Sequence, residues 1–263
     1  MEINGSTKVM GVIGSPIAHS LSPLIHNLFA GHFGSNIVYT AFDVAPQNLT
    51  TAVEGARALG IIGLNVTAPH KSEAAKLAAS LDASAKQIGA VNLLKLSEVG
   101  YVGHNTDIYG VKKALEYKGI DMSGKTAALV GAGGAAGAAA VSMAQLGAKK
   151  VFIINRTRSK AESLANILDM YYNIDTEICE LCDCAADVLI LAATPDFTPQ
   201  GLDRFNIIFD MNYHPPNRIS RAFGGPEMLV YQAAKSYEII LGTEVPAKII
   251  DEILVKIKGR LLC

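Results

Sequence analysis

The stretch that decides the fold of this chain is Ala127-Ala128-Leu129-Val130-Gly131-Ala132-Gly133-Gly134-Ala135-Ala136. Its apolar start is typical of a buried strand, and the glycines that follow fit the pattern G-x-G-x-x-[GA] where a helix begins. Gly131 permits the tight turn, Gly133 lets backbone approach a diphosphate, and small Ala136 permits close packing of helix on strand. Because a helix N-terminus offers unpaired N–H donors, we expect a dinucleotide to be held by Gly131, Gly133, Gly134, Ala135 and Ala136.

The wider segment Thr126–Ala148 carries no charge and is long enough to cross a bilayer. It consists mostly of Ala and Gly, which gives little of the hydrophobicity that insertion needs. A strand followed by a close-packed helix is therefore the better interpretation. The alternative that this helix packs tightly and binds nothing stays open.

Cations follow the next predicted strand, Val151–Ile154, at a distance where NAD-selective sites carry Asp or Glu for the ribose 2′-hydroxyl. Arg156, at the strand end, can instead bind a 2′-phosphate through charge-assisted hydrogen bonds, which favours NADP. A solvated helix start would explain Arg158 and Lys160 equally well. The predicted cofactor residues here are Asn155, Arg156, Thr157, Arg158 and Lys160.

Composition excludes several classes of protein. Half of the 263 residues are hydrophobic, with 24 Gly and 10 Pro, which excludes disordered and low-complexity chains. The net charge of −1 argues against nucleic acid and anionic membranes as partners. Four cysteines are too few to stabilise a chain of this length by disulfide bonds, which favours a location in the reducing cytoplasm. Cys179, Cys182 and Cys184 have spacing that suits zinc or a redox pair, but a strand edge is favoured and no metal is predicted.

Strand and helix patterns alternate along most of the chain, which predicts an α/β fold with parallel sheets covered by helices. Ser22, before Pro23, is the predicted N-cap of the first helix. Gly119–Gly124 is the best linker candidate. The predicted strands are 9–14, 37–42, 63–66, 92–96, 101–104, 127–130, 151–154, 188–192 and 207–210; the predicted helices are 22–33, 46–59, 71–80, 107–118, 134–146, 158–172, 227–241 and 245–261.

Polar clusters follow the strands of the first half, where ligands bind in open α/β sheets. They are Ser20–Pro23, Asn65–Lys71, Ala90–Asn92 and Asn105–Asp107. These clusters offer hydroxyls, amides, one ammonium and one carboxylate. Together these groups suit a ligand that is a small polyhydroxylated acid. Each residue alone could simply cap a helix or bond the backbone of a turn. Their joint occurrence favours a substrate site.

The combination closely resembles the shikimate dehydrogenase family over about residues 8 to 260. The hallmark motifs occur in its order: Gly14–Pro23, Asn65-Val66-Thr67-x-Pro69-x-Lys71, Asn105-Thr106-Asp107, and Gly131–Ala136 with Asn155-Arg156-Thr157. The resemblance implies that Ser20 and Ser22 bind a substrate carboxylate, that Thr67, Asn92 and Asp107 hold ring hydroxyls, and that Lys71 lies beside the reacting oxygen. It likewise implies substrate roles for Tyr213 and Gln232, and places Gly225 near the nicotinamide.

Hydride transfer to a carbonyl carbon needs a positioned acid or base, which agrees with a catalytic pair Lys71 and Asp107. A lysine ammonium can also stabilise the developing alkoxide. A neighbouring carboxylate favours charged lysine, whereas a general base must be neutral. The sequence therefore identifies the catalytic pair but does not establish whether the lysine is protonated.

The resemblance implies a substrate domain over 1–106, completed by about 236–263, and a Rossmann domain over 107–235. The expected reaction is NADPH-dependent reversible reduction of 3-dehydroshikimate to shikimate, in aromatic amino acid biosynthesis, by a monomer or homodimer. Departures from the family pattern occur at Ala68, His70, Ile108-Tyr109, Gly137 and Leu191–Asp196. A quinate or aminoshikimate dehydrogenase, or a catalytically weak NADP-binding paralogue, therefore remains an alternative.

Overall fold

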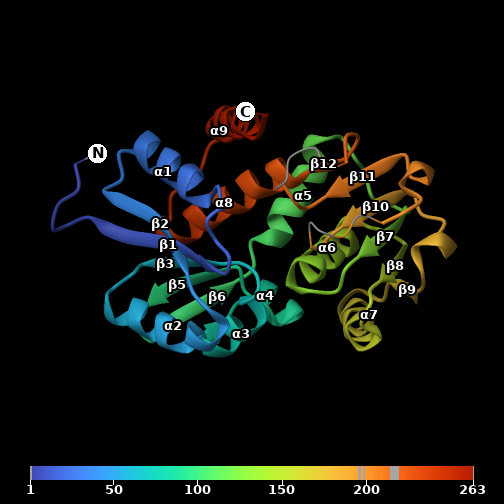
Figure 1. Cartoon of the computed structure of the whole chain (residues 1–263), viewed down its shortest axis with the longest axis horizontal. Coiled ribbons are helices and arrows are strands. Elements are labelled where there is room, and N and C mark those ends of the chain that lie inside the picture. Colours follow the sequence, from blue (N-terminus) through green and yellow to red (C-terminus); the bar gives the residue numbers. More distant parts are fainter. Residues whose placement is uncertain (1, 195–196, 198, 214–218, 263) are drawn as a thin grey trace. The chain divides into compact units, whose positions relative to one another are not determined.

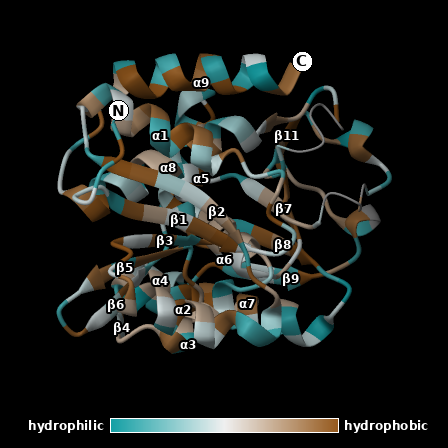
Figure 2. Cartoon of the chain, turned by 60° about the vertical axis from the view of Figure 1, so that its left-hand side comes forward, coloured by the Kyte–Doolittle hydropathy of each residue, from teal (hydrophilic) through white to brown (hydrophobic). Residues whose placement is uncertain are grey.

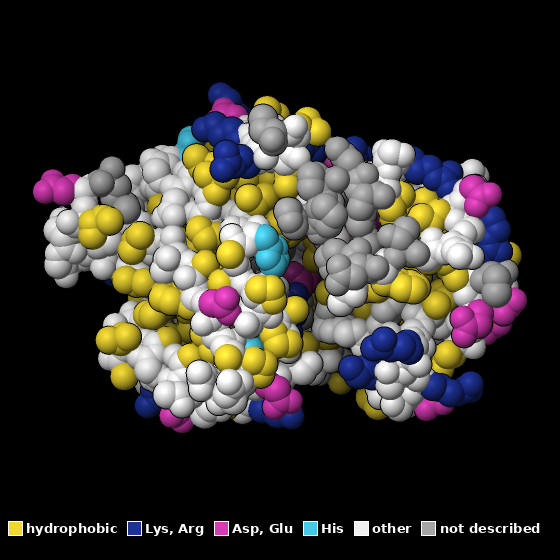
Figure 3. Space-filling view, in the orientation of Figure 1, with side chains coloured by type: hydrophobic (Ala, Val, Ile, Leu, Met, Phe, Trp, Pro, Cys, Tyr) yellow, Lys and Arg dark blue, Asp and Glu magenta, His cyan; other side chains and the backbone are white. Residues whose placement is uncertain are grey.

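The computed structural model describes residues 2–194, 197, 199–213 and 219–262. The chain forms two compact units. The first comprises Met1–Thr106 and Val230–Gly259, and the second comprises Asp107–Leu229 and Arg260–Cys263. Figure 3 shows that acidic and basic side chains are interspersed on the visible face, as the near-zero net charge predicts.

The first unit contains a six-stranded sheet of order β2-β1-β3-β5-β6-β4 (Figure 1). Its central strands are apolar and buried, since helices cover them. The elements are β1 Lys8–Gly14, α1 Ser22–Phe33, β2 Ile37–Asp43, the 3₁₀ turn η1 Pro46–Asn48, α2 Leu49–Ala58, β3 Gly63–Val66, α3 Lys71–Leu77, β4 Ser80–Leu81, α4 Ala83–Ile88, β5 Leu93–Ser97 and β6 Gly100–His104.

The predicted α/β fold is confirmed, and the sheet of this unit is mixed because one of its strands runs against its neighbours. Strand β5 runs antiparallel to both β3 and β6. The cause is local: β5 and β6 are joined by a tight turn in which the Ser97 hydroxyl donates to the Gly100 carbonyl at 2.6 Å. A tight turn can connect only antiparallel neighbours, because parallel ones need a long crossover.

The second unit contains a parallel sheet of order β12-β11-β10-β7-β8-β9. This is the 3-2-1-4-5-6 order of dinucleotide-binding sheets, and the strand order reverses between β7 and β10. Its elements are α5 Asp107–Tyr117, β7 Thr126–Val130, α6 Gly134–Gln145, β8 Lys150–Ile154, α7 Arg158–Tyr172, β9 Asp175–Ile178, η2 Leu181–Asp183, β10 Val188–Leu191, η3 Leu202–Arg204, β11 Ile207–Asp210 and β12 Phe223–Gly224.

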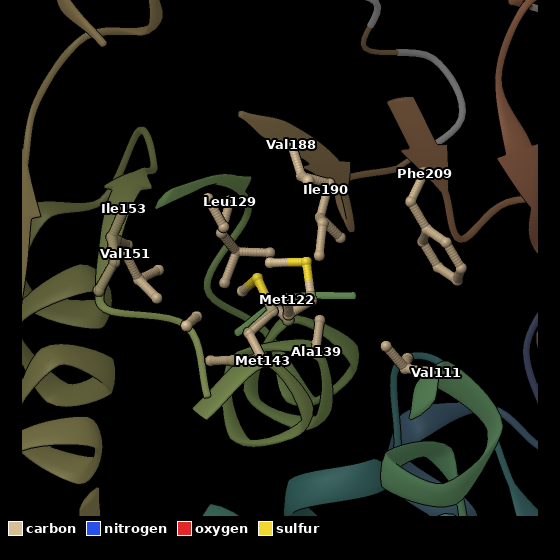
Figure 4. Close-up of a cluster of buried hydrophobic side chains, with 14 of the residues drawn as sticks. Val111, Met122, Leu129, Ala139, Met143, Val151, Ile153, Val188, Ile190 and Phe209 are labelled. Atoms are coloured by element: carbon tan, nitrogen blue, oxygen red, sulfur yellow. The ribbon is translucent and has the colours of Figure 1, made fainter. Parts of the chain in front are cut away.

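The core of the second unit explains the uncharged segment Thr126–Ala148. Its residues form β7 and α6, and Ala139 and Met143 of α6 are fully buried with strand residues Leu129, Ile153 and Ile190 (Figure 4). No helix within the described ranges is long and apolar enough to cross a membrane. The interpretation as strand plus packed helix is thereby confirmed.

Segment Gly119–Gly124 is not the linker that the sequence predicted. It joins α5 to β7 inside the second unit, and Met122, only 1% exposed, lies in the core of that unit. The glycines serve the turns, since both Gly119 and Gly124 have positive φ. The division between the units lies instead at Thr106 and Asp107.

Two long helices close the chain, α8 Gly225–Leu241 and α9 Ala247–Leu262. From Val230 onward α8 belongs to the first unit, and Tyr237 packs there against Phe29 and Phe33 of α1. Helix α9 alternates hydrophobic and hydrophilic residues in Figure 2, as its amphipathic sequence predicts. The sequence predicted that the C-terminal helices pack against the first half of the chain, and for α8 this packing includes the aromatic contacts of Tyr237.

His26 lies in that aromatic cluster and is 1% exposed. Its ring stacks flat on Tyr39 at 4.2 Å between centroids, and neither ring nitrogen has a hydrogen-bond partner among the described residues. Burial lowers the pKa of His26 to about 3, so the ring is neutral at physiological pH.

Candidate functional site

Two loops of the first unit meet beyond the carboxyl ends of β1 and β3. The strands are parallel, with Ile13 opposite Val66, and the Ser15 N–H donates to the Ala68 carbonyl at 3.2 Å. Gly14 allows this approach, since a Cβ there would overlap the Thr67 side chain. The loops that carry the predicted substrate residues thus lie at one edge of the sheet.

The start of α1 differs from the prediction. Leu21, not Ser22, is the N-cap, and Ser22 opens the helix with Pro23 behind it. The Ser20 hydroxyl accepts the Ser22 N–H at 3.3 Å, so Ser20 satisfies one of the N–H donors that the start of the helix leaves unpaired. Ser22 itself is 7% exposed.

A network of uncharged side chains joins Asn92, before β5, to α8 and Thr106. Asn92 Nδ2 donates to Thr106 Oγ1 at 2.8 Å and to Gln232 Oε1 at 3.3 Å, and Asn92 Oδ1 accepts the Thr106 N–H at 2.7 Å. Thr106 Oγ1 also lies 3.0 Å from Ser236 Oγ, which accepts Asn65 Nδ2 at the same distance. The predicted residues Asn92 and Gln232 are therefore brought together.

Sequence reasoning missed Ser236 and Tyr39 in this network. Tyr39 donates its hydroxyl to Asn65 Oδ1 at 2.9 Å. Ser236 follows Gln232 by one helical turn, so the i, i+4 spacing could have revealed it. Tyr39 had no such signal, because it reaches Asn65 of β3 from β2, and β1 lies between these two strands in the sheet.

Lys71 begins α3 and is partly buried, and its carbonyl accepts the Val91 N–H at 3.0 Å, next to Asn92. Asp107 is 4% exposed and opens α5 in the second unit. The pairing of Lys71 with Asp107 stays a prediction. His70 is 2% exposed, and its Nε2 lies 2.7 Å from the Val44 carbonyl.

A carboxylate holds the segment before Thr106 in place. Asp82 accepts His104 Nδ1 at 2.8 Å, Ser84 Oγ at 2.6 Å and the Ala85 N–H at 2.9 Å. Burial opposes ionisation, but these hydrogen bonds prevail and lower the pKa of Asp82 to about 2. Ser84 Oγ in turn accepts the Asn105 N–H at 3.0 Å, which fixes the loop that presents Thr106.

The glycine turn of the second unit has the geometry that a diphosphate requires. Gly131 has φ +117°, and a Cβ there would press on the backbone of Ala192 and Ala193 at 3.1 to 3.2 Å. Gly133 is the N-cap of α6, and the space where its Cβ would point is open. Ala136 is fully buried against the sheet. The arrangement fits an anion at the N-terminus of α6, where Gly134 and Ala135 form the first turn.

The predicted phosphate clamp lies beyond β8, in the same unit. Asn155 Nδ2 donates to the Thr157 carbonyl at 2.8 Å, which shapes the turn into α7. Arg158 is paired with Glu162 at 2.9 Å. Arg156 and Lys160 are exposed, and the described part of the chain offers neither side chain a hydrogen bond or ion pair. Arg156 and Lys160 are therefore more available to an external phosphate than Arg158 is.

Tyr213 and Gly225, separated in sequence, are neighbours in the second unit. A Cβ on Gly225 would collide with the Asn212 carbonyl and approach the Tyr213 nitrogen at 3.0 Å. Glycine is thus required where α8 begins beside this loop. Of the unusual segment Leu191–Asp196, Pro195 and Asp196 lie outside the described residues.

The described cysteines are free thiols, with Cys179 Sγ 2.9 Å from Cys184 Sγ. Burial raises the pKa of both thiols. No group of three metal-ligating side chains occurs among the residues that the structure describes, and the side chain of Cys182 is not among these.

A mixed α/β unit joined to a parallel sheet with this strand order and glycine turn is the architecture of a dinucleotide-dependent dehydrogenase. The family model "Shikimate dehydrogenase substrate binding domain" matches residues 12–94, and "Shikimate / quinate 5-dehydrogenase" matches residues 112–197. The chain therefore belongs to the shikimate dehydrogenase family.

Individual relatives agree over nearly the whole chain. The NADP(+) shikimate dehydrogenase of Methanocaldococcus jannaschii is 37% identical, covering 92% of this chain and 94% of the relative. A crystal structure of a shikimate dehydrogenase in complex with NADP+ is 34% identical, with TM-score 0.83 and coverage of 97% of both chains. The Listeria monocytogenes shikimate 5-dehydrogenase, in complex with shikimate and NAD, is 29% identical, with TM-score 0.84 and coverage of 97% of this chain and 98% of that chain.

Proposed function

We propose that the protein is an NADP-dependent shikimate dehydrogenase, which reversibly reduces 3-dehydroshikimate to shikimate in aromatic amino acid biosynthesis. The observation that carries this proposal is the uncharged network of Asn92, Thr106 and Gln232 at the sheet edge where α3 presents Lys71. Amides and hydroxyls in such a cluster recognise a ring bearing several hydroxyl groups. The relative from Methanocaldococcus jannaschii and the structure in complex with NADP+ support this cofactor, and the Listeria monocytogenes structure in complex with shikimate supports this substrate.

In this proposal the first unit is the substrate domain and the second the cofactor domain. The hydroxyls of Ser20 and Ser22 hold the substrate carboxylate. Asn92 and Gln232 bind ring hydroxyls through their amides, and the Thr67 hydroxyl, which has no partner among the described residues, adds a further contact. Tyr213 is a further substrate-binding residue in this proposal.

Lys71 carries the proton chemistry. Its ammonium donates a proton to the C3 oxygen during reduction and stabilises the negative charge that develops there. The Asp107 carboxylate is the second member of the proposed acid–base pair. When bound, NADP supplies or accepts the hydride at the carbon.

The residues of the second unit fit this cofactor. The open space at Gly133 and the N–H groups that begin α6 suit a diphosphate, and Arg156 suits the 2′-phosphate, with Arg158 and Lys160 beside it. Gly225 lies near the nicotinamide in this proposal. The sequence has four cysteines, too few to cross-link such a chain by disulfides, which favours the proposed cytoplasmic location.

The test is a steady-state assay of NADPH formation from NADP+ with shikimate, and in parallel with quinate and with NAD+. We expect kcat/KM to be at least about tenfold higher for shikimate with NADP+ than for either alternative pairing, which corresponds to roughly 1.4 kcal/mol. A higher value with quinate would reassign the substrate. Binding of both ligands without NADPH formation would instead identify a non-catalytic paralogue.

A further inference from the structure

Cys179 and Cys184 are placed for a reaction that hydride transfer does not use. Cys179 follows β9, and its N–H donates to the Ile153 carbonyl of β8 at 3.3 Å. Cys184 ends η2, and its N–H donates to the Leu181 carbonyl at 3.3 Å. With both backbones held in this way, the two sulfurs lie 2.9 Å apart.

We propose that Cys179 and Cys184 form a modification site at which a small disulfide compound oxidises the two thiols to an intrachain disulfide. A disulfide bond needs about 2.04 Å between sulfurs, so they must approach by roughly 0.9 Å. The segment between the two anchored cysteines is short, which keeps each sulfur within reach of the other.

The exposure of the two thiols sets the order of events. Cys179 is partly exposed, whereas Cys184 is 6% exposed within the apolar cluster beside Leu181 and Phe205. The Cys179 thiolate attacks the reagent R–S–S–R, forms the mixed disulfide Cys179–S–S–R and releases one thiolate RS⁻. The Cys184 thiolate then attacks Cys179 Sγ, closes the intrachain bond and releases a second RS⁻. Two thiols are oxidised and one disulfide is reduced, and the two protons pass to the released thiolates.

Neighbouring charges determine which reagent reacts. The carboxylates of Glu177, Glu180 and Asp183 act on Cys179 and disfavour its thiolate. They also repel an anionic reagent. The Arg204 charge acts in the opposite direction on Cys184. An uncharged disulfide is therefore the appropriate oxidant, and the raised pKa of both thiols makes the reaction slow.

The experiment incubates the reduced full-length protein with bis(2-hydroxyethyl) disulfide, quenches it with acid and measures intact mass and peptide connectivity. We expect a loss of two hydrogen masses, with Cys179 linked to Cys184. The Cys182→Ser variant should form the same link. The Cys184→Ala variant, which keeps a small apolar residue in the buried position, should stop at a stable hydroxyethylthio adduct on Cys179.

Two outcomes would overturn the proposal. One is a wild-type protein that accumulates the adduct on Cys179 while Cys184 stays reduced. The other is a link that includes Cys182 in the wild type and is lost in Cys182→Ser. Because the wild-type and Cys182→Ser proteins decide the matter alone, the inference stays testable even where Cys184→Ala does not fold.

Discussion

Asn92 donates from Nδ2 to Oε1 of Gln232 at 3.3 Å across 140 positions of sequence. Both side chains are buried, at 3% and 8% exposed. The contact joins the loop before β5 to α8. Helix α8 therefore contributes Gln232 to a cluster that also contains residues from the first half of the chain.

Removal of the Gln232 amide should weaken substrate binding. For Gln232→Ala we expect KM for shikimate to rise about tenfold, because a lost hydrogen bond that leaves buried groups unpaired costs roughly 1–3 kcal/mol. Gln145→Ala is the matched control, since that glutamine bonds only exposed groups such as Lys112 Nζ. Steady-state kinetics measure both variants. An unchanged KM in Gln232→Ala would remove this residue from the substrate site.

Loss of Lys71 should affect turnover more than binding. Lys71→Ala is expected to lower kcat by about 10²- to 10⁴-fold, the usual weight of an acid–base group, while KM for shikimate changes little. Lys76→Ala alters the same helix at an exposed position that pairs only with Glu73, and should retain full activity. If Lys71→Ala turns over at the wild-type rate, the proton comes from elsewhere.

The cations after β8 should differ in their contribution to cofactor choice. Arg156→Ala is expected to weaken NADP+ binding by roughly 1.5–3 kcal/mol, the range of hydrogen bonds to charged groups, and to leave NAD+ binding nearly unchanged. Arg158→Ala should cost less, since that guanidinium is already paired with Glu162. Titration of each variant with both cofactors measures this, and equal losses for NADP+ and NAD+ would reject the phosphate clamp.

His26 should make the protein sensitive to acid. Its pKa of about 3 lies below the ordinary 6.5, so the unfolded chain binds the extra proton between these values. Stability is fully present above about pH 6.5 and falls by about 1.4 kcal/mol per pH unit below it, toward pH 3. Asp82 acts separately, between its ordinary 3.8 and about 2.

Urea unfolding of His26→Phe at pH 4.5 to 7 tests this, because phenylalanine suits the aromatic cluster and does not titrate. We expect a flatter pH dependence than in the wild type. His32→Gln, which removes an exposed histidine of the same helix, should keep the wild-type slope. Identical slopes for wild type and His26→Phe would show that His26 does not control acid stability.

Long apolar patterns and glycine spacing predicted most of the fold. Residues 127–136 specified the strand, turn and helix correctly, because Gly131 and Ala136 are demanded by close backbone packing. Short elements were missed: β9, with the sequence Asp-Thr-Glu-Ile, buries no residue fully and offers too little apolar contrast. Strands 92–96 and 101–104 were predicted from the sequence, and the structure confirms them as the antiparallel neighbours β5 and β6.

The site was predicted less completely than the fold. Motif residues such as Asn92 and Gln232 could be chosen from sequence, but their contact requires tertiary structure. Gly119–Gly124 illustrates the opposite error: glycines at both ends suggested a linker, whereas Met122 between them is a core residue.

The Asn92–Thr106–Gln232 network contains no formal charge, whereas the proposed cofactor clamp depends on Arg156. Dissolved ions screen an exposed guanidinium but leave buried amide dipoles nearly untouched. Rising ionic strength should therefore weaken binding of the dinucleotide at this clamp more than it disturbs recognition of the ring hydroxyls by the network.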